Sequence, residues 1–505
     1  MILDKNYYLD TFGVTETQMR SLVCLGLSGG GDYSDLFFES TSYYDLLLRD
    51  GIVSSGGSHV DYGCGIRTLK GEKTGYSYTE STDAPALVAA AKAAAAIAGG
   101  ASDNLHEGQI LKLIRDAKDR AALYSPSENN GGRPVRRFFQ GSPNPNADRY
   151  PMHQDWRTAD NARLIPVLET IHKRICEGDS RVVKVIAALS SAVKDVLMYN
   201  SFEELKYDTR PIASISVSVV FKQGERVENK SVSRSYRAGV EMITDALIDE
   251  IVSEALKDID ARFEAGRPKG GQMPVVMGAG ASGILLHEAM GHSFEADFNR
   301  KGQSIFTGKI GTRICKPGIN IIDDATLAGN RGSLNFDDEG VPGQRTYMVE
   351  DGILTSYLHD RISARYFGVT PTGNGRRESF RYNPIPRMRA TYMEGGSDGT
   401  REDLIASVKK GIYVDQFANG QVKIGEGDFT FYVKSGYLIE DGHLTQPIKD
   451  INIIGNGPQA LADMQAVADD LKVDEGTWTC GKGQSVPVSC GIPSVLISNL
   501  TVGGE

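Results

Sequence analysis

The chain has 505 residues, of which 40% are hydrophobic and 24% are charged, a composition typical of a soluble globular protein with two or three domains. Its formal net charge of −10 and the lack of a long basic run argue against binding to nucleic acid or to an anionic membrane. No apolar run approaches the ~20 residues that span a bilayer, and the N-terminus does not read as a signal peptide, so we expect a cytoplasmic protein.

The first part of the chain is predicted to form a strand meander followed by a helix. Between Tyr33 and Glu80, apolar and polar residues alternate between turn signals, and Asp50-Gly51 predicts a hairpin because both turn residues must tolerate positive φ. The segment "TDAPALVAAAKAAAAIAGG" then predicts an alanine-rich helix, with Pro85 in its first turn and Gly99-Gly100 at its end.

The middle of the chain is predicted to contain a loop, a helix and two strands. Residues 125–160 are rich in Pro, Gly, Asn and Ser, which indicates a long surface loop or linker. The stretch "NARLIPVLETIHKRICEG" is typical of an amphipathic helix. It leads into "RVVKVIAALSSAVKDVLMY" and "IASISVSVVF", whose β-branched residues indicate strands.

Near Arg237 the sequence pattern changes from strands to a long helix and then to further strands and turns. Residues 238–266 predict one long amphipathic helix, and beyond about residue 310 strands and turns dominate, with hairpins in "YMVEDGILTSYL" and "YLIEDGHLTQPI". We therefore predict an α+β fold with two domains. Residues 1–236 would form an N-terminal α/β domain with a strand meander, and residues 237–505 a C-terminal strand-rich antiparallel sheet or barrel-like domain that carries the helix described next.

The stretch "PVVMGAGASGILLHEAMGH", residues 274–292, can be interpreted in two ways. Gly278, Gly280 and Gly283 match the G-x-G-x-x-G turn between a strand and a helix that holds a dinucleotide pyrophosphate. Such a site also needs an acidic residue ~20 positions further on and a parallel βαβ unit, and neither follows here. The glycines are better explained as a tight turn from a strand into a closely packed helix.

The second half of the same stretch indicates a metal site. His287 and His292 supply two imidazole ligands, and Glu288 supplies a carboxylate that can take a proton from an attacking water. In a regular helix, positions i and i+5 are about 140° apart, so a helix end or a π-bulge at Gly291 would be needed to bring both rings together. The alternative is a pair of buried, hydrogen-bonded histidines on a core helix.

Several longer motifs resemble the TldD branch of the TldD/PmbA family. They are "DYSDLFFE", "LRDGIVSSG", "GIRTLKGEKTGYSY", "LHEAMGHSFEADFNRKGQSIFTGKIG", "NFDDEGVPGQ", "TPTGNGRRESF", "GIYVDQFANGQVKIGEGDFTF" and "TCGKGQSVPV…ISNLTVGG". They follow the order of the family and cover most of the chain.

The resemblance implies a cytoplasmic metallopeptidase of a family first named for modulation of DNA gyrase. In this family the histidines of H-E-x-x-x-H bind zinc, which matches His287 and His292, and the glutamate is the general base, which matches Glu288. A C-terminal cysteine completes the zinc site and matches Cys480. The resemblance also implies unfolded or extended peptides as substrates, bound as an added β-strand. The PmbA branch lacks the metal motif and pairs with TldD.

The residues themselves support Cys480 as a ligand but leave alternatives open. It stands in a glycine-containing turn with Lys482 nearby to favour the thiolate, and Cys490 is the second choice. Glu295 and Asp297 could donate oxygen, although acidic residues just after a helix are usually solvated. The basic cluster "GNGRRESF" is expected to be salt-bridged surface, with anchoring of a substrate carboxylate as the alternative.

The predicted function is therefore a zinc-dependent peptidase that works in the cytoplasm as a homodimer or as a heterodimer with a PmbA-type (TldE) subunit. The alternative is a non-catalytic protein that binds or regulates a toxin or a DNA-gyrase-related partner. Nucleotide binding through the glycine turn is not expected.

Overall fold

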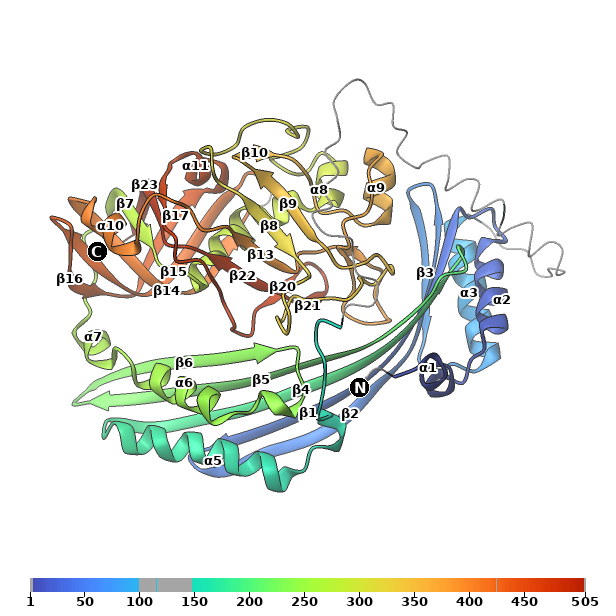
Figure 1. Cartoon of the computed structure of the whole chain (residues 1–505), viewed down its shortest axis with the longest axis horizontal. Helices are drawn as coiled ribbons and strands as arrows, with labels where there is room; N and C mark the ends of the chain where they lie inside the picture. Colours follow the sequence, from blue (N-terminus) through green and yellow to red (C-terminus); the bar gives the residue numbers. More distant parts are fainter. Residues whose placement is uncertain (1–2, 100–114, 116–147, 424, 504–505) are drawn as a thin grey trace.

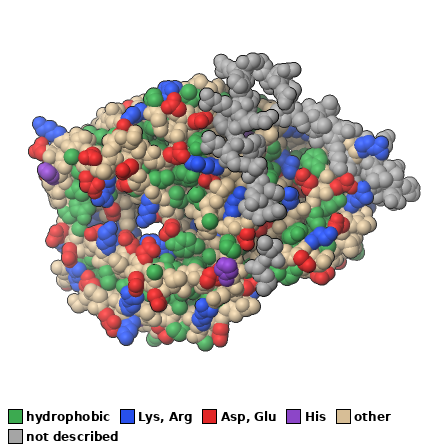
Figure 2. All heavy atoms as spheres, viewed as in Figure 1, with side chains coloured by type: hydrophobic (Ala, Val, Ile, Leu, Met, Phe, Trp, Pro, Cys, Tyr) green, Lys and Arg blue, Asp and Glu red, His purple; other side chains and the backbone are tan. Residues whose placement is uncertain are grey.

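The computed structural model describes residues 3–99, 115, 148–423 and 425–503. A long curved sheet from the N-terminal half lies beneath a set of strands from the C-terminal half, and helices cover the outer side of the sheet (Figure 1). Acidic and basic side chains are interspersed on the face that Figure 2 shows. Within the described ranges, every helix is too short or too polar to span a lipid bilayer.

The N-terminal sheet is antiparallel and has the strand order β3-β2-β1-β4-β5-β6. Its strands are β1 (Tyr33–Arg49), β2 (Ile52–Lys70), β3 (Lys73–Thr79), β4 (Val182–Asn200), β5 (Leu205–Gln223) and β6 (Arg226–Tyr236). The predicted hairpin between β1 and β2 is confirmed, because Asp50 and Gly51 have φ values of 50° and 81°. Most of the predicted loop at 125–160 lies outside the described residues.

Helices pack on this sheet in two groups. The first contains α1 (Lys5–Phe12), α2 (Glu16–Leu27) and α3 (Ala84–Ala98), and the second contains α5 (Asn161–Gly178), α6 (Asp245–Leu256) and α7 (Ile259–Glu264). The predicted alanine-rich helix is confirmed as α3: Asp83 caps its first turn and Gly99 follows its last. Alternate residues of β4, such as Val185 and Leu189, pack in the same hydrophobic cluster as α5 and α6.

The single long helix predicted at 238–266 is wrong, because a 3-10 turn (Val240–Met242) and the two separate α-helices α6 and α7 occupy this stretch. Between α6 and α7, Lys257 is extended with a ψ of 142°, and Asp258 is left-handed with a φ of 59°, so the helix is interrupted there. Both helices bury their apolar side chains in one cluster with the sheet, at Ile251, Ala255, Ile259 and Phe263. The four-residue spacing of these side chains therefore continues across the break and imitates one helix.

The C-terminal half contains a small closed barrel. Its strands are β7 (Gly271–Met277), β14 (Lys410–Val422), β15 (Asp428–Glu440), β17 (Ile451–Asn456) and β23 (Val495–Gly503). Outside the barrel path, β16 (His443–Ile448) pairs with β15 and β18 (Met464–Val467) pairs with β23. The path β14-β7-β23-β17-β15 closes because β14 also pairs with β15. The predicted barrel-like C-terminal half is confirmed.

A second sheet and two hairpins stand beside the barrel. The sheet has the order β10 (Ile353–Leu354), β9 (Arg345–Glu350), β8 (Ile321–Asp324), β13 (Ala390–Met393), β22 (Ser489–Ile492) and β19 (Lys472–Val473). The hairpins are β11 (Gly375–Arg376) with β12 (Ile385–Pro386), and β20 (Thr479–Gly481) with β21 (Ser485–Pro487). The short helices are α8 (Ala296–Arg300), α9 (Arg361–Phe367), α10 (Arg401–Ala406) and α11 (Gly457–Ala462). Asp351 and Asp441, both with a φ of 49°, form the two predicted Asp-Gly hairpins.

Buried ion pairs join the N-terminal sheet to the C-terminal half. The side chain of Arg67 on β2 is fully buried, and its Nη1 lies 2.6 Å from Oε1 of Glu339 while its other nitrogens contact Asp35. Arg210 on β5 pairs with Asp338 at 2.5 Å. Removing one partner of a buried ion pair costs about 3–5 kcal/mol, because the other charge is left unpaired. These pairs therefore stabilise the observed contact between the N-terminal sheet and the C-terminal half. The predicted division at residues 236/237 stays a prediction.

Candidate metal centre

The glycine turn before the histidines is required by packing. Gly280 has a φ of 88°, in the region that favours glycine. A Cβ on Gly283 would lie 2.5 Å from the backbone nitrogen of Gly491 on β22, so only glycine permits this approach. The preceding strand β7 pairs in parallel with β14 and antiparallel with β23, which is not the βαβ arrangement of a dinucleotide site.

The histidine-bearing segment is a π-helix that covers Leu286–Gly291, followed by a 3-10 turn, His292–Phe294. A π-helix has i→i+5 hydrogen bonds, so residues five apart return to the same side of the helix. The predicted departure from a regular helix is therefore confirmed. Gly291 itself has ordinary helical angles, but a Cβ there would lie 2.1 Å from Sδ of buried Met388, so a larger residue would have to displace the Met388 side chain.

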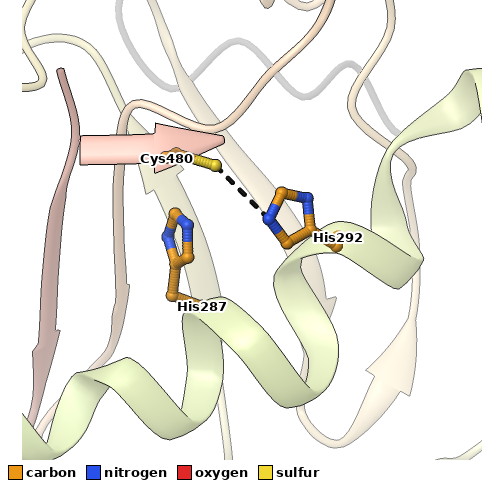
Figure 3. Close-up of side chains that lie close together, drawn as sticks. All are labelled: His287, His292 and Cys480. Carbon is orange, nitrogen blue, oxygen red and sulfur yellow. Dashed lines mark hydrogen bonds between the residues drawn. The ribbon is translucent and has the colours of Figure 1, made fainter. Parts of the chain in front are cut away.

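The structure brings His287, His292 and Cys480 together (Figure 3). One ligand atom from each lies within 4.8 Å of the others, and all three residues are buried. Nε2 of His292 is 3.3 Å from Sγ of Cys480, and the two imidazole centroids are 5.3 Å apart. Nδ1 of His287 is buried and has no hydrogen-bond partner among the described residues. Unpartnered buried polar atoms are uncommon, and this one belongs to a ring of the ligand cluster.

Charges around the cluster favour a cation in it. Burial alone would raise the pKa of the Cys480 thiol, but His287 and His292 outweigh burial and lower this pKa to about 4. Burial would likewise lower the pKa of His292, but the Glu295 carboxylate and the Cys480 sulfur raise it well above its ordinary value. A thiolate beside a buried carboxylate stabilises positive charge, whether a proton or a metal ion carries it.

Two nitrogens and one sulfur fit a transition-metal ion. This is the donor set that zinc and its neighbours prefer, and three protein ligands leave a coordination position for water or substrate. Because the three ligand atoms already lie within 4.8 Å of one another, the described residues fit such an ion without a change of fold.

Glu295 is a functional candidate that the sequence interpretation placed wrongly on the solvated surface. It is fully buried, and its Oε2 lies 2.9 Å from Nδ1 of His292 and 2.9 Å from Nζ of Lys482. Burial would raise the pKa of Glu295, but Lys482, His292 and Arg387 lower it to about 2. Asp297 is partly buried, and its Oδ1 lies 2.7 Å from Nζ of Lys482. Lys482 therefore forms ion pairs with both Glu295 and Asp297. The spacing from His292 to Glu295 was a usable signal, because a ligand histidine needs an acceptor for its second nitrogen.

Cys480 was expected in a glycine-containing turn, but it lies in strand β20 and is 2% exposed. Arg387 fixes the hairpin by donating from Nη1 to the Gln484 carbonyl at 2.8 Å and from Nη2 to the Cys480 carbonyl at 2.5 Å. Cys490, the second choice, is buried in β22 and is not part of the cluster. Burial raises the pKa of the Cys490 thiol well above its ordinary value.

Glu288 directly follows the first histidine on the π-helix and is half-buried. Its carboxylate has no hydrogen bond or ion pair with any residue in the described part of the chain, whereas Glu295 has several contacts. A carboxylate with no protein partner remains able to accept a proton from water or substrate.

The basic cluster "GNGRRESF" was expected to be salt-bridged surface, and this expectation is wrong. Arg376 and Arg377 are each 3% exposed and lie beneath the β20–β21 hairpin. Arg376 donates to the backbone carbonyls of Met388 and Pro487, so it helps to hold the hairpin that carries Cys480.

Comparison with known families agrees with this geometry. Models of PmbA/TldA metallopeptidases match the chain in order: domain 1 at residues 34–98, the central domain at 154–262 and the C-terminal domain at 270–504. The chain belongs to the PmbA/TldD metallopeptidase family. The resemblance predicted from its motifs is confirmed.

Relatives of this PmbA/TldD family member are named as metalloproteases. A metalloprotease TldD homolog from Haemophilus influenzae is 38% identical over 94% of this chain and 93% of its own length. A metalloprotease TldD homolog from Buchnera aphidicola is 36% identical over the same shares. A zinc metalloprotease TldD homolog from Saccharolobus solfataricus is 33% identical over 58% of this chain and 65% of that protein.

Solved structures show the PmbA/TldD fold in more distant proteins. TldE from Thermococcus kodakarensis has a TM-score of 0.70 with 19% identity, covering 96% of this chain and 100% of that chain. A candidate modulator of a DNA gyrase from Thermotoga maritima also has a TM-score of 0.70, with 20% identity over 96% of this chain and 99% of that chain.

Proposed function

We propose that this chain is a zinc-dependent peptidase that hydrolyses unfolded or extended peptides. His287, His292 and Cys480 would hold the zinc ion, and Glu288 would be the general base. The observation that carries the proposal is the convergence of three buried ligand atoms within 4.8 Å of one another. The S. solfataricus relative, named as a zinc metalloprotease, supports zinc over other metals.

Each residue has a separate task in this proposal. Zinc, when bound, would supply Lewis-acid chemistry, which polarises a carbonyl and makes water nucleophilic near neutral pH. Glu288 would accept the proton of the attacking water and return it to the leaving amine. Glu295 would hold His292 in the tautomer whose Nε2 faces the site, because its carboxylate accepts a hydrogen bond from Nδ1–H.

We further propose that the chain acts in the cytoplasm with a second subunit, either a copy of itself or a PmbA-type subunit. The fold that it shares with T. kodakarensis TldE supports a partner of this type. Light scattering of the purified chain, alone and mixed with a PmbA-type protein, measures which assembly forms.

The deciding experiment combines metal analysis with peptide digestion. The purified chain, together with any subunit that co-purifies, is expected to contain one zinc per chain. It is expected to cleave an unfolded peptide, to lose cleavage with a chelator and to regain it with added zinc. A chain that binds zinc but leaves a broad panel of peptides intact would contradict the proposal and favour a non-catalytic binding protein.

A further inference from the structure

A cavity of about 390 Å³ lies between the β20–β21 hairpin and the N-terminal sheet. Thr479, Ser485 and Pro487 line it from the hairpin, and Ser190 and Ser214 line it from strands β4 and β5. This volume is within the ~300–1,000 Å³ range of small-ligand pockets. Thr479 directly precedes Cys480, so the cavity and the metal cluster share the hairpin as a common wall.

Three arginines in this cavity have no acidic partner. Arg331 donates to the Trp478 carbonyl at 2.8 Å and to hydroxyl oxygens of Ser235 and Thr479. Arg376 donates to two backbone carbonyls, and so does Arg237. No carboxylate among the described residues lies within ion-pair distance of Arg237, Arg331 or Arg376.

The acidic groups around the cavity do not neutralise these three arginines. Asp338 is already paired with Arg210 and accepts a hydrogen bond from the Arg377 backbone nitrogen at 2.8 Å. Glu378 is exposed and accepts from the backbone nitrogen of Ser485, while Asp45 is exposed. The cavity therefore holds buried positive charge in excess of its local negative charge.

Burial of this excess positive charge is unfavourable. Burial and the neighbouring Arg237 lower the pKa of Arg331 to about 10, and the same causes lower that of Arg376 to about 9. A guanidinium nevertheless stays charged in proteins, so the cost of desolvation is not removed by loss of a proton. An anion bound between the arginines would offset it.

We propose that this cavity binds a carboxylate group of the peptide on which the chain acts, an inference that rests on the proposed peptidase function. A planar guanidinium presents paired donors that match a carboxylate, and charge-assisted hydrogen bonds of this type are among the stronger ones in proteins. The serine and threonine hydroxyls on the cavity wall are further donors. The carboxylate is either the peptide's C-terminus or an acidic side chain, and matched ligands distinguish the two sources.

The test measures peptide binding without cleavage. Isothermal titration calorimetry uses the metal-loaded Glu288→Gln chain with any subunit that co-purifies. One pair of peptides ends in a free acid or in an amide. A second pair, blocked at both ends, contains Glu or Gln at the same internal position. In at least one pair, the carboxylate form is expected to bind about tenfold more tightly. Equal affinities within both pairs would overturn the proposal. It would also be overturned if the chain bound inorganic phosphate but none of the peptides.

Variants then locate the effect. Arg331→Gln is expected to abolish the preference for the carboxylate, and Arg331→Lys is expected to retain part of it because the charge remains. Arg345→Gln is the matched control, since Arg345 is also partly exposed but lies on β9 outside the cavity and pairs with Glu394. An unchanged preference in Arg331→Gln and in Arg376→Gln, both folded by circular dichroism, would place the carboxylate elsewhere. If the unaltered chain cleaves no peptide, the peptidase proposal fails. If it cleaves peptides but the carboxylate and neutral forms bind equally well to the Glu288→Gln chain, only the inference about the cavity fails.

Discussion

Nδ1 of His292 and Oε2 of Glu295 lie 2.9 Å apart in a fully buried environment, while Nε2 of the same ring faces Cys480. The neighbouring cations hold the pKa of Glu295 at about 2, so its carboxylate is ionised and only accepts. Nδ1 must therefore carry a hydrogen, and when the ring is neutral, as a metal ligand must be, the Nε2 lone pair is directed toward the cluster.

This relationship predicts that Glu295→Gln weakens zinc binding by about 10-fold to 100-fold, the usual effect of losing the partner of a ligand histidine. Competition with a chromophoric chelator measures the zinc dissociation constant. The matched control is Asp297→Asn, because Asp297 contacts Lys482 at 2.7 Å without contacting His292. Equal zinc affinity in both variants would show that Glu295 does not orient the ligand.

The role proposed for Glu288 predicts a separation of metal binding from catalysis. Glu288→Gln is expected to keep one zinc per chain and to lower peptide cleavage by about 100-fold to 10,000-fold, since a general base contributes about this much. Metal analysis and a fluorogenic peptide assay on the same sample check both parts. Cleavage that persists near the original rate would require another base.

The two cysteines near the C-terminus make a matched pair. Cys480→Ser is expected to remove most of the bound zinc because a serine hydroxyl is a much poorer zinc ligand than a thiolate. Cys490→Ser is expected to keep the zinc, since Cys490 is buried in β22 outside the cluster. Zinc is counted by mass spectrometry after gel filtration. If only the Cys490→Ser variant lost its zinc, Cys490 and not Cys480 would be the zinc ligand.

Gly291→Ala tests the packing that supports the π-helix. Alanine usually stabilises a helix interior by roughly 0.5–1 kcal/mol over glycine. Here the added Cβ would meet Met388 Sδ at 2.1 Å, and Met388 is fully buried. We therefore expect a loss of about 1–3 kcal/mol in the free energy of unfolding, the usual cost of overpacking. Urea denaturation measures it, with Gly57→Ala as the control because no atom lies near a Cβ there. A more stable Gly291→Ala chain would contradict the prediction.

Local patterns predicted much of the fold and the metal-binding candidates His287 and His292, whereas the choice of Cys480 depended on the family resemblance. Asp-Gly pairs fixed three hairpins because their backbone requirements are local, and the five-residue spacing of His287 and His292 indicated an irregular helix. The burial of Glu295 and Arg376 was missed because it depends on contacts with segments far away in the chain. Charged residues are buried only with such contacts, and the one local signal, the spacing of Glu295 from His292, indicates a partner for the ring but not burial. The break at Asp258 was missed because both helices cover the same sheet.

The sulfur of Cys480 and the ring of His292 meet across 188 positions of sequence, and only the last strands follow the cysteine. During synthesis, the complete set of ligands exists only after the β20–β21 hairpin has left the ribosome. A growing or truncated chain that ends before the β20–β21 hairpin has two imidazoles and no thiolate. The fold thus delays assembly of the full ligand set until 188 residues have been added after His292.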